Sequence, residues 1–243
     1  MKFELYNNSI FKECFLTIGE IIDEIVLECD SEGIRCNALD KSHITFVSLE
    51  LNAALFDDYS CPTPERVVVD SNELIKILKR MKPADVLHGE VTDSHFILRF
   101  EGDSSRTFKS ALIDAEYDSA VPPRIDHPVC VELPSELLET FLDDLLLFGE
   151  NILFIVDEDY LICRGEGELG DSESKYLHGV NVSAVVRSKF SIAKIKAMMK
   201  ARKVSRNVSL YLGDDLPCSV VFVSDDSCCR LRFLLAPRLE EEG

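Results

Sequence analysis

The sequence predicts an α+β protein built from two similar domains, each packing two helices on a mostly antiparallel sheet. Four segments carry apolar residues at helical spacing, and most of the others alternate as strands do. Helices and strands follow the same order in both halves, with corresponding elements offset by about 120 to 126 positions. Between the halves, residues 112–134 contain four prolines and show neither periodicity, so we expect an irregular connector there.

The first half is expected to begin with a helix over residues 9–22. One face of this helix carries its apolar side chains, which are Ile10, Phe11, Cys14, Phe15 and Ile18. A second helix should start at Asp70, which has capping-box spacing to Glu73, and should end before Pro83. Strands are expected at residues 25–29, 33–38, 43–51, 66–69, 86–91, 95–100 and 106–113.

The second half repeats this arrangement. A third helix is expected over residues 135–147, with its apolar side chains at the spacing of the first helix. These side chains are Leu137, Leu138, Phe141, Leu142 and Leu145. A fourth helix is expected over residues 191–202. Strands are expected at residues 152–156, 160–165, 174–178, 208–212, 219–224 and 230–235.

The composition is that of a globular protein, with 46% hydrophobic and 29% charged residues among 243. No run of about eighteen apolar residues exists, and the N-terminus lacks the apolar core of a signal peptide. We therefore expect neither a membrane span nor secretion. The nine cysteines show no C-x-x-C spacing, which favours small buried residues in a reducing compartment over zinc ligands.

The net charge of −18 disfavours a simple nucleic-acid-binding protein, because the average field repels phosphate. Two predicted helices nevertheless carry basic islands without acidic residues. Residues 76–82 contain four basic residues, and residues 194–206 contain six. This pattern indicates a protein that holds DNA on chosen helix faces while the remaining surface is acidic.

Residues 165–170 read GEGELG and satisfy the G-x-G-x-x-G pattern of dinucleotide-binding loops. Such a loop must open a helix, whereas the residues that follow read as a strand, and nearby acidic residues would repel phosphate. We interpret the motif as a turn between strands, and an enzyme that uses it is the least favoured hypothesis.

No histidine clusters near the carboxylate pairs at 143–144, 214–215 and 225–226. No catalytic residue, metal site or cofactor is therefore predicted.

Several stretches resemble the sliding clamps of the proliferating cell nuclear antigen family, and its archaeal members in particular. They are residues 39–44 (LDKSHI), 108–114 (FKSALID), 165–170 (GEGELG), 212–217 (LGDDLP) and 233–240 (FLLAPRLE). The resemblance spans the chain in order. It implies a non-enzymatic DNA polymerase processivity factor, in which three subunits form a ring around duplex DNA. Helices would line the channel and sheets would lie outside, in accord with the charge pattern.

The resemblance and the helical spacing together assign basic channel residues. The positions that match the family are Lys12, Lys76, Lys79 and Lys200, and helical spacing adds Arg80, Lys196 and Lys203. The third helix departs from the family, since Thr140 and Asp143 stand where many relatives have arginine. Its exposed face also carries Glu136, Glu139 and Asp144. This departure supports an alternative, a checkpoint-type or heterotrimeric clamp subunit that acts mainly as a protein scaffold.

The resemblance also implies an apolar groove for short partner peptides that contain a glutamine and paired aromatic residues. The matching positions are Leu39, Ile44, Phe46, Val121, Pro123, Pro217, Leu234, Ala236 and Pro237. Core packing is the competing interpretation for Ile44 and Phe46. The implied partners are a clamp loader, DNA polymerase, flap endonuclease and DNA ligase, with no membrane.

Subunits of the family join by pairing edge strands, here residues 105–113 of one chain and 172–179 of the next. The positions expected at this interface are Ser105, Thr107, Lys109, Ala111, Ser174, Tyr176 and His178. The expected domains span residues 1–113 and 132–243, joined by a connector at 114–131. The location implied is the cytoplasm, at the nucleoid, for an archaeal protein and the nucleus for a eukaryotic one.

Overall fold

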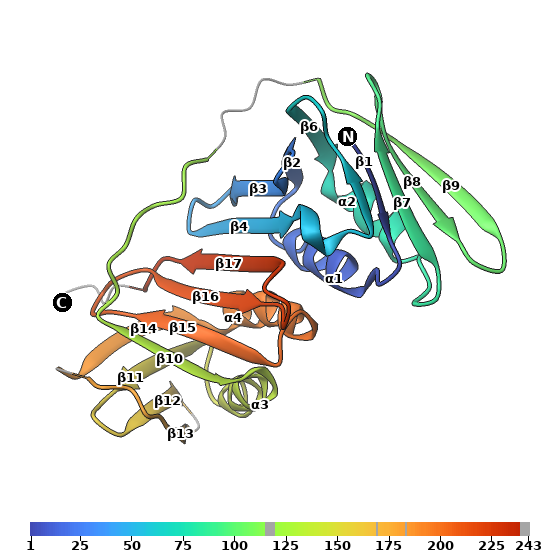
Figure 1. Cartoon of the computed structure of the whole chain (residues 1–243). Coiled ribbons are helices and arrows are strands. Elements are labelled where there is room, and N and C mark those ends of the chain that lie inside the picture. Colours follow the sequence, from blue (N-terminus) through green and yellow to red (C-terminus); the bar gives the residue numbers. More distant parts are fainter. Residues whose placement is uncertain (115–119, 169, 183, 239–243) are drawn as a thin grey trace. The chain divides into compact units, whose positions relative to one another are not determined.

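The computed structural model describes residues 1–114, 120–168, 170–182 and 184–238 (Figure 1). The chain divides into two compact units. The first comprises Met1–Pro122 and Val223–Leu231, and the second comprises Pro123–Phe222 and Arg232–Gly243. Strand β17 (Cys229–Leu235) therefore contributes residues to both units.

The first unit contains antiparallel strands and two helices. One sheet has the order β5-β1-β7-β8-β9, with β5 (Asp58–Ser60), β1 (Lys2–Leu5), β7 (Val86–Val91), β8 (His95–Glu101) and β9 (Ser105–Ala111). A second set has the order β4-β3-β2-β6, with β4 (Thr45–Asn52), β3 (Gly33–Leu39), β2 (Glu24–Asp30) and β6 (Glu65–Asp70). The helices α1 (Ser9–Ile18) and α2 (Ser71–Leu78) pack against each other, and a 3-10 turn, η1 (Ala53–Leu55), follows β4.

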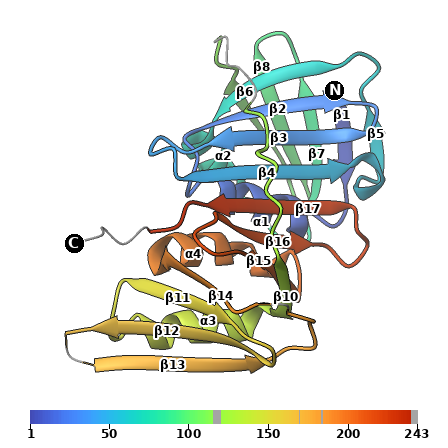
Figure 2. The same cartoon turned by 90° about the vertical axis from the view of Figure 1, so that its left-hand side faces the viewer.

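The second unit likewise combines antiparallel strands with two helices. One sheet has the order β13-β12-β11-β14, with β13 (Gly170–Leu177), β12 (Tyr160–Gly167), β11 (Asn151–Val156) and β14 (Val186–Ser191). The strands β10 (Val129–Pro134), β15 (Asn207–Leu212) and β16 (Cys218–Val223) lie next to one another in that order. Helix α3 (Ser135–Leu145) packs against α4 (Ile192–Met199), which continues into a 3-10 turn, η2 (Lys200–Lys203) (Figure 2). The predicted α+β class with two helices per repeat is confirmed.

The cores form where the apolar helix stripes meet the sheets. On α1, Phe11 and Phe15 are fully buried, and the ring of Phe11 lies 5.4 Å from that of Phe3 on β1. In the second unit, Leu138 and Leu142 of α3 are fully buried. Burial of each such side chain contributes about 1.5–3 kcal/mol to folding, so these stripes determine which helix face points inward.

Helix α2 begins as its sequence predicts. The carboxylate of Asp70 accepts a hydrogen bond of 2.8 Å from the backbone N–H of Glu73, which satisfies one of the unpaired donors at the helix start. This N-cap fixes the point at which strand β6 turns into the helix. The basic residues that follow Asp70 in the sequence are thereby placed at defined positions around α2.

All four helices end earlier than predicted, and α2 stops at Leu78 rather than just before Pro83. Helix α1 stops at Ile18, and the chain continues as a turn in which Ile21 N–H donates to the carbonyl of Ile18. Helix α3 stops at Leu145 rather than at residue 147. Helix α4 gives way to 3-10 geometry at Lys200. Tighter i to i+3 bonds at helix ends are common, and apolar periodicity does not distinguish them from a further α-helical turn.

Four strands were not predicted: β1, β5, β10 and β14. Strand β10 lies inside the proline-rich stretch, so the expectation of irregular structure throughout residues 112–134 is wrong at its C-terminal end. This strand is first in its sheet order and pairs with β15. An outer strand needs hydrogen bonds on one side only, so Pro128, which precedes β10, and Pro134, its last residue, are compatible with it.

Candidate functional site

The basic residues predicted on α1 and α2 lie close to the end of α2. Lys12 is half-buried, and its ammonium group donates a hydrogen bond of 2.7 Å to the carbonyl of Met81. Lys76, Lys79 and Arg80 are exposed, and none of them forms an ion pair with a residue that the structure describes. This face of the first unit therefore presents uncompensated positive charge to solvent.

The basic residues of the second unit have a different environment. Lys196 on α4 forms an ion pair with Asp143 on α3. Arg202 lies in the basic island at 194–206 but is not among the predicted channel residues, and its Nε is 2.6 Å from an Oε of Glu139. Lys200 and Lys203 are exposed and lie three positions apart on η2, where 3-10 geometry places them on the same side.

Helix α2 is joined to strand β9 near both of its ends. At the N-terminal end, the carboxylate of Glu73 accepts a hydrogen bond of 3.1 Å from the hydroxyl of Ser110. Beyond the C-terminal end, Arg106 donates to the carbonyl of Arg80 at 2.9 Å and forms an ion pair with buried Asp85. The predicted DNA-contacting helix and the predicted subunit-edge strand are therefore held together.

Strands β9 and β13 each lie at the end of a sheet order, as the subunit-pairing prediction requires. The side chains of Ser105, Thr107, Lys109 and Ala111 on β9 are all exposed. On β13, Ser174 and Tyr176 are half-buried.

His178 follows β13 and is buried. Its ring Nε2 lies 3.1 Å from the carbonyl oxygen of Asp157, and its backbone N–H donates a hydrogen bond to the carbonyl of Asp159. These contacts hold His178 against the loop that precedes β12, the strand with which β13 pairs.

The motif at residues 39–44 forms the loop between β3 and β4, and a buried carboxylate organises it. Asp40 Oδ1 accepts hydrogen bonds of 2.9 Å from the backbone N–H groups of Ile44 and Thr45. Its other oxygen accepts a hydrogen bond of 2.5 Å from the hydroxyl of Ser42. His43 adopts a left-handed conformation with φ of 59°, which lets the loop close in few residues.

This loop presents two apolar side chains to solvent. Leu39 and Ile44 are 42% and 41% exposed, although both adjoin buried segments of strand. A depression of about 440 Å³ lies beside Leu39, with Ile22, Val26 and Ala38 among its apolar lining. At its polar side, Lys41 forms an ion pair of 2.6 Å with Asp23. A concave apolar surface with a few polar groups is typical of a ligand or peptide site.

The other predicted groove residues divide by exposure. Val121 is 83% exposed and Pro123 is also exposed. Pro217, Ala236 and Pro237 are half-buried. Phe46 and Leu234 are buried, at 6% and 3% exposure. Sequence periodicity does not distinguish exposed Leu39 from buried Phe46 and Leu234, because all three lie within strands.

The glycine-rich motif at 165–170 belongs to a β-hairpin. Strands β12 and β13 pair in register up to Gly167 and Gly170, so the motif does not open a helix. A Cβ atom on Gly167 would lie 1.5 Å from the carbonyl oxygen of Phe148. The glycine is needed for this close backbone approach, and the interpretation of the motif as a turn is confirmed.

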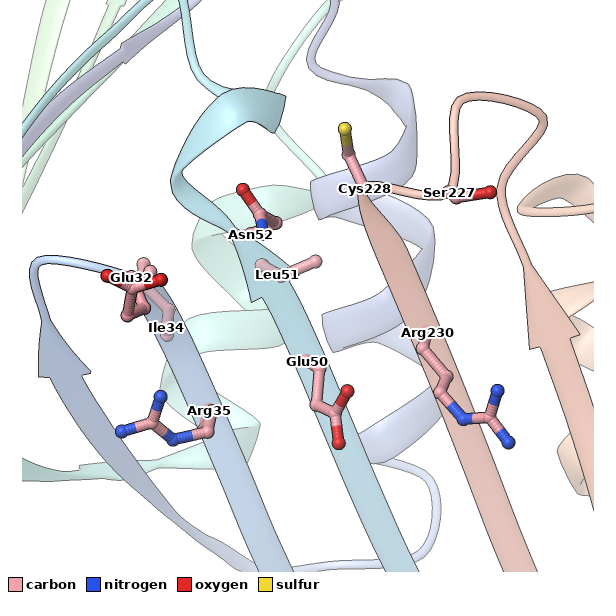
Figure 3. A pocket seen from close by; sticks show the side chains of 10 residues that line it. Glu32, Ile34, Arg35, Glu50, Leu51, Asn52, Ser227, Cys228 and Arg230 are labelled. Carbon is pink, nitrogen blue, oxygen red and sulfur yellow. The ribbon is translucent and has the colours of Figure 1, made fainter.

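A small polar pocket of about 180 Å³ lies over β3, β4 and β17 in the first unit (Figure 3). Figure 3 shows Glu50 between Arg35 and Arg230 on neighbouring strands. Arg35 also forms an ion pair with Asp30, and its hydrogen bond lowers the pKa of that carboxyl group. With cations and carboxylates alternating, this pocket has no excess charge to bind an ionic ligand.

Seven of the nine cysteines are buried, as expected of small apolar residues. Burial raises the pKa of Cys29, Cys36 and Cys218 to about 12 each, so these thiols stay protonated at neutral pH.

No group of three histidine, cysteine or acidic side chains suited to a metal ion occurs among the described residues. Within the same residues, no helix is long and apolar enough to cross a membrane.

Comparison with known proteins places this chain in a family. The model of the proliferating cell nuclear antigen N-terminal domain matches residues 1–119. The DNA polymerase sliding clamps of Methanobrevibacter smithii and Methanothermobacter thermautotrophicus are each 44% identical over 241 residues, covering 99% of both chains. The DNA polymerase sliding clamp of Thermococcus gammatolerans is 31% identical over 239 residues, covering 95% of both chains.

The fold, the exposed basic helix faces and these relatives define a non-enzymatic clamp. The chain belongs to the proliferating cell nuclear antigen family of DNA polymerase sliding clamps, with archaeal relatives. The predicted resemblance is confirmed, and so is the predicted role of a processivity factor without enzymatic activity, because both follow from family membership.

The Asp40 hydrogen bonds predict a large loss of stability in the variant Asp40→Ala. Two backbone N–H groups would lose their acceptor, and Thr45 is fully buried, so we expect a loss of about 2–3 kcal/mol. The variant Ser42→Ala removes one donor only and should cost about 1 kcal/mol or less. Urea unfolding at a fixed protein concentration measures both. Equal stability of the two variants would contradict the role given to Asp40.

Proposed function

We propose that three copies of this chain close into a ring that encircles duplex DNA and slides along it. The observation that carries this proposal is the exposed positive charge of Lys76, Lys79 and Arg80 on a protein with a net charge of −18. In a family of sliding clamps, such a confined basic surface is best explained by contact with the phosphate backbone.

A closed ring would hold DNA topologically, so individual phosphate contacts need only be weak. Exposed lysine and arginine side chains make sequence-independent contacts that exchange readily with counterions. Residues Lys12, Lys196, Lys200 and Lys203 are proposed to face the same channel. The domain assignment of residues 1–113 and 132–243, joined at 114–131, is proposed with it, and residues 115–119 of the connector lie outside the described residues.

Subunits are proposed to join head to tail, strand β9 of one copy pairing with β13 of the next. Both strands end their sheet orders and offer backbone groups for pairing. A heterologous contact of this kind closes into a ring when its rotation fits. His178 is buried, so we expect its side chain to hold β13 in place rather than to touch the neighbouring subunit.

Partner enzymes are proposed to bind through short peptides that carry a glutamine and paired aromatic residues. The exposed side chains of Leu39, Ile44 and Val121, and the depression beside Leu39, support this proposal. The contributions of Phe46, Pro123, Pro217, Leu234, Ala236 and Pro237 rest on the family resemblance. The proposed partners are DNA polymerase, flap endonuclease, DNA ligase and a clamp loader, at the nucleoid of an archaeal cell.

A second candidate function is a scaffold subunit of a heterotrimeric or checkpoint-type clamp. The observation that favours it is the acidic face of α3, which carries Glu136, Glu139, Asp143 and Asp144. In such an assembly another subunit would supply the missing positive charge. The two candidates differ in whether this chain alone can be retained on closed circular DNA.

Retention on DNA tests the proposed ring. After loading with a matched clamp loader, the protein should stay on nicked circular DNA through a sizing column and should be lost once the DNA is linearised. The reason is that a free end lets a topologically bound ring slide off, whereas direct contacts are unaffected by an end. Equal retention on both forms would contradict sliding, and no retention on either would favour the scaffold subunit.

Peptide binding tests the apolar loop. The variant Ile44→Gln should weaken the binding of a fluorescent glutamine–aromatic peptide by about ten-fold or more, because it places a polar group in an apolar contact. Tyr6→Gln is a matched control, since Tyr6 is also exposed, at 61%, and lies in the same unit. Fluorescence anisotropy measures both variants. An unchanged affinity for Ile44→Gln would show that the peptide binds elsewhere.

A further inference from the structure

The two ion pairs between α3 and the α4–η2 segment involve half of the acidic residues on the third helix. Glu139 and Asp143 lie four positions apart on α3 and therefore share one helix face. Asp143 pairs with Lys196, and Glu139 pairs with Arg202 at 2.6 Å. The remaining acidic residues, Glu136 and Asp144, are exposed and form no ion pair with any residue in the described part of the chain.

The first unit offers the opposite case on its own helices. Lys76, Lys79 and Arg80 make no ion pair with the described residues and face solvent. Lys12 donates to a neutral backbone carbonyl rather than to a carboxylate. Both units pack two helices on strands, but they differ in whether a carboxylate pairs with the cations named here.

We propose that Glu139 and Asp143 compete with DNA phosphates for Arg202 and Lys196, and so set how weakly the second unit holds DNA. This inference rests on the proposed function. Each carboxylate neutralises the cation with which it pairs, so a phosphate gains the full attraction of either cation only when it displaces the carboxylate that the same unit supplies. The first unit, whose cations are available, then makes most of the phosphate contacts.

The exposure of the pairs fits competition rather than permanent neutralisation. The side chains are 34% exposed for Lys196, 56% for Asp143, 37% for Arg202 and 32% for Glu139. Ion pairs at such positions are weak, and the stabilisation of each corresponds to about five-fold in an equilibrium constant at most. DNA can therefore displace the carboxylates transiently, which keeps contacts short-lived during sliding.

Two double variants separate this competition from a general change of charge. The variant Glu139→Gln/Asp143→Asn frees Arg202 and Lys196. The control Glu136→Gln/Asp144→Asn removes the same charge from the same helix but leaves both ion pairs in place. Any effect of the average field on DNA binding is common to the two variants, so only the difference between them reports on the ion pairs.

The measurement is binding of the full-length protein to a short, blunt, fluorescent duplex, by anisotropy between about 50 and 200 mM salt. We expect Glu139→Gln/Asp143→Asn to bind at least about five-fold more tightly than the control. The slope of log K against log salt should steepen by about 0.9 for each freed cation that reaches a phosphate. Equal affinities and slopes for the two variants would overturn the inference.

Retention on circular DNA distinguishes this failure from failure of the proposed function. If the unsubstituted protein is retained on circles and both double variants bind the short duplex alike, the ring stands and only the competition is wrong. If the unsubstituted protein is not retained on circles, the proposed function fails and the inference fails with it.

Circular dichroism and elution volume establish that both variants remain folded, which is expected because all four substituted side chains lie at the surface.

Discussion

The burial of one apolar stripe on each helix is the constraint on which the rest of this protein depends. Phe11 and Phe15 on α1, and Leu138 and Leu142 on α3, are fully buried. The apolar and charged residues of these helices lie on opposite faces, so a helix that buries its apolar face turns its charged face to solvent. The hydrophobic core therefore sets which way the cations that we propose to contact DNA point, and the polar contacts at both ends of α2 add to it.

The same constraint explains how one fold supports two electrostatic outcomes. In the first unit, α2 and the turn that follows it carry cations with no carboxylate partner among the described residues. In the second, α3 directs Glu139 and Asp143 toward the cations of α4 and η2. Neither arrangement disturbs the core, since the charged residues lie outside the buried stripe. Charge on the helix faces can thus change while the fold is kept.

Much of the fold could be predicted from the sequence because its signals are local. The stripe of α1 and the N-cap at Asp70 depend on residues within two helical turns. Strand β10 was missed because prolines suggest irregular structure unless the strand is known to be an outer one. The ion pair between Asp143 and Lys196 joins residues 53 positions apart, so only the packing of α3 on α4 reveals it. Resemblance pointed to the loop at Asp40, but the hydrogen bonds that organise it required the structure.

The central claim is that this chain forms a self-sufficient ring, and its absolute mass in solution tests that claim most directly. Light scattering on a sizing column at physiological salt should give three times the chain mass of 27.4 kDa. Head-to-tail pairing of two sheet edges predicts a closed ring, and the family resemblance implies three subunits in it. The mass of a single chain at every concentration tested would contradict the claim and would favour a subunit that needs different partners to close.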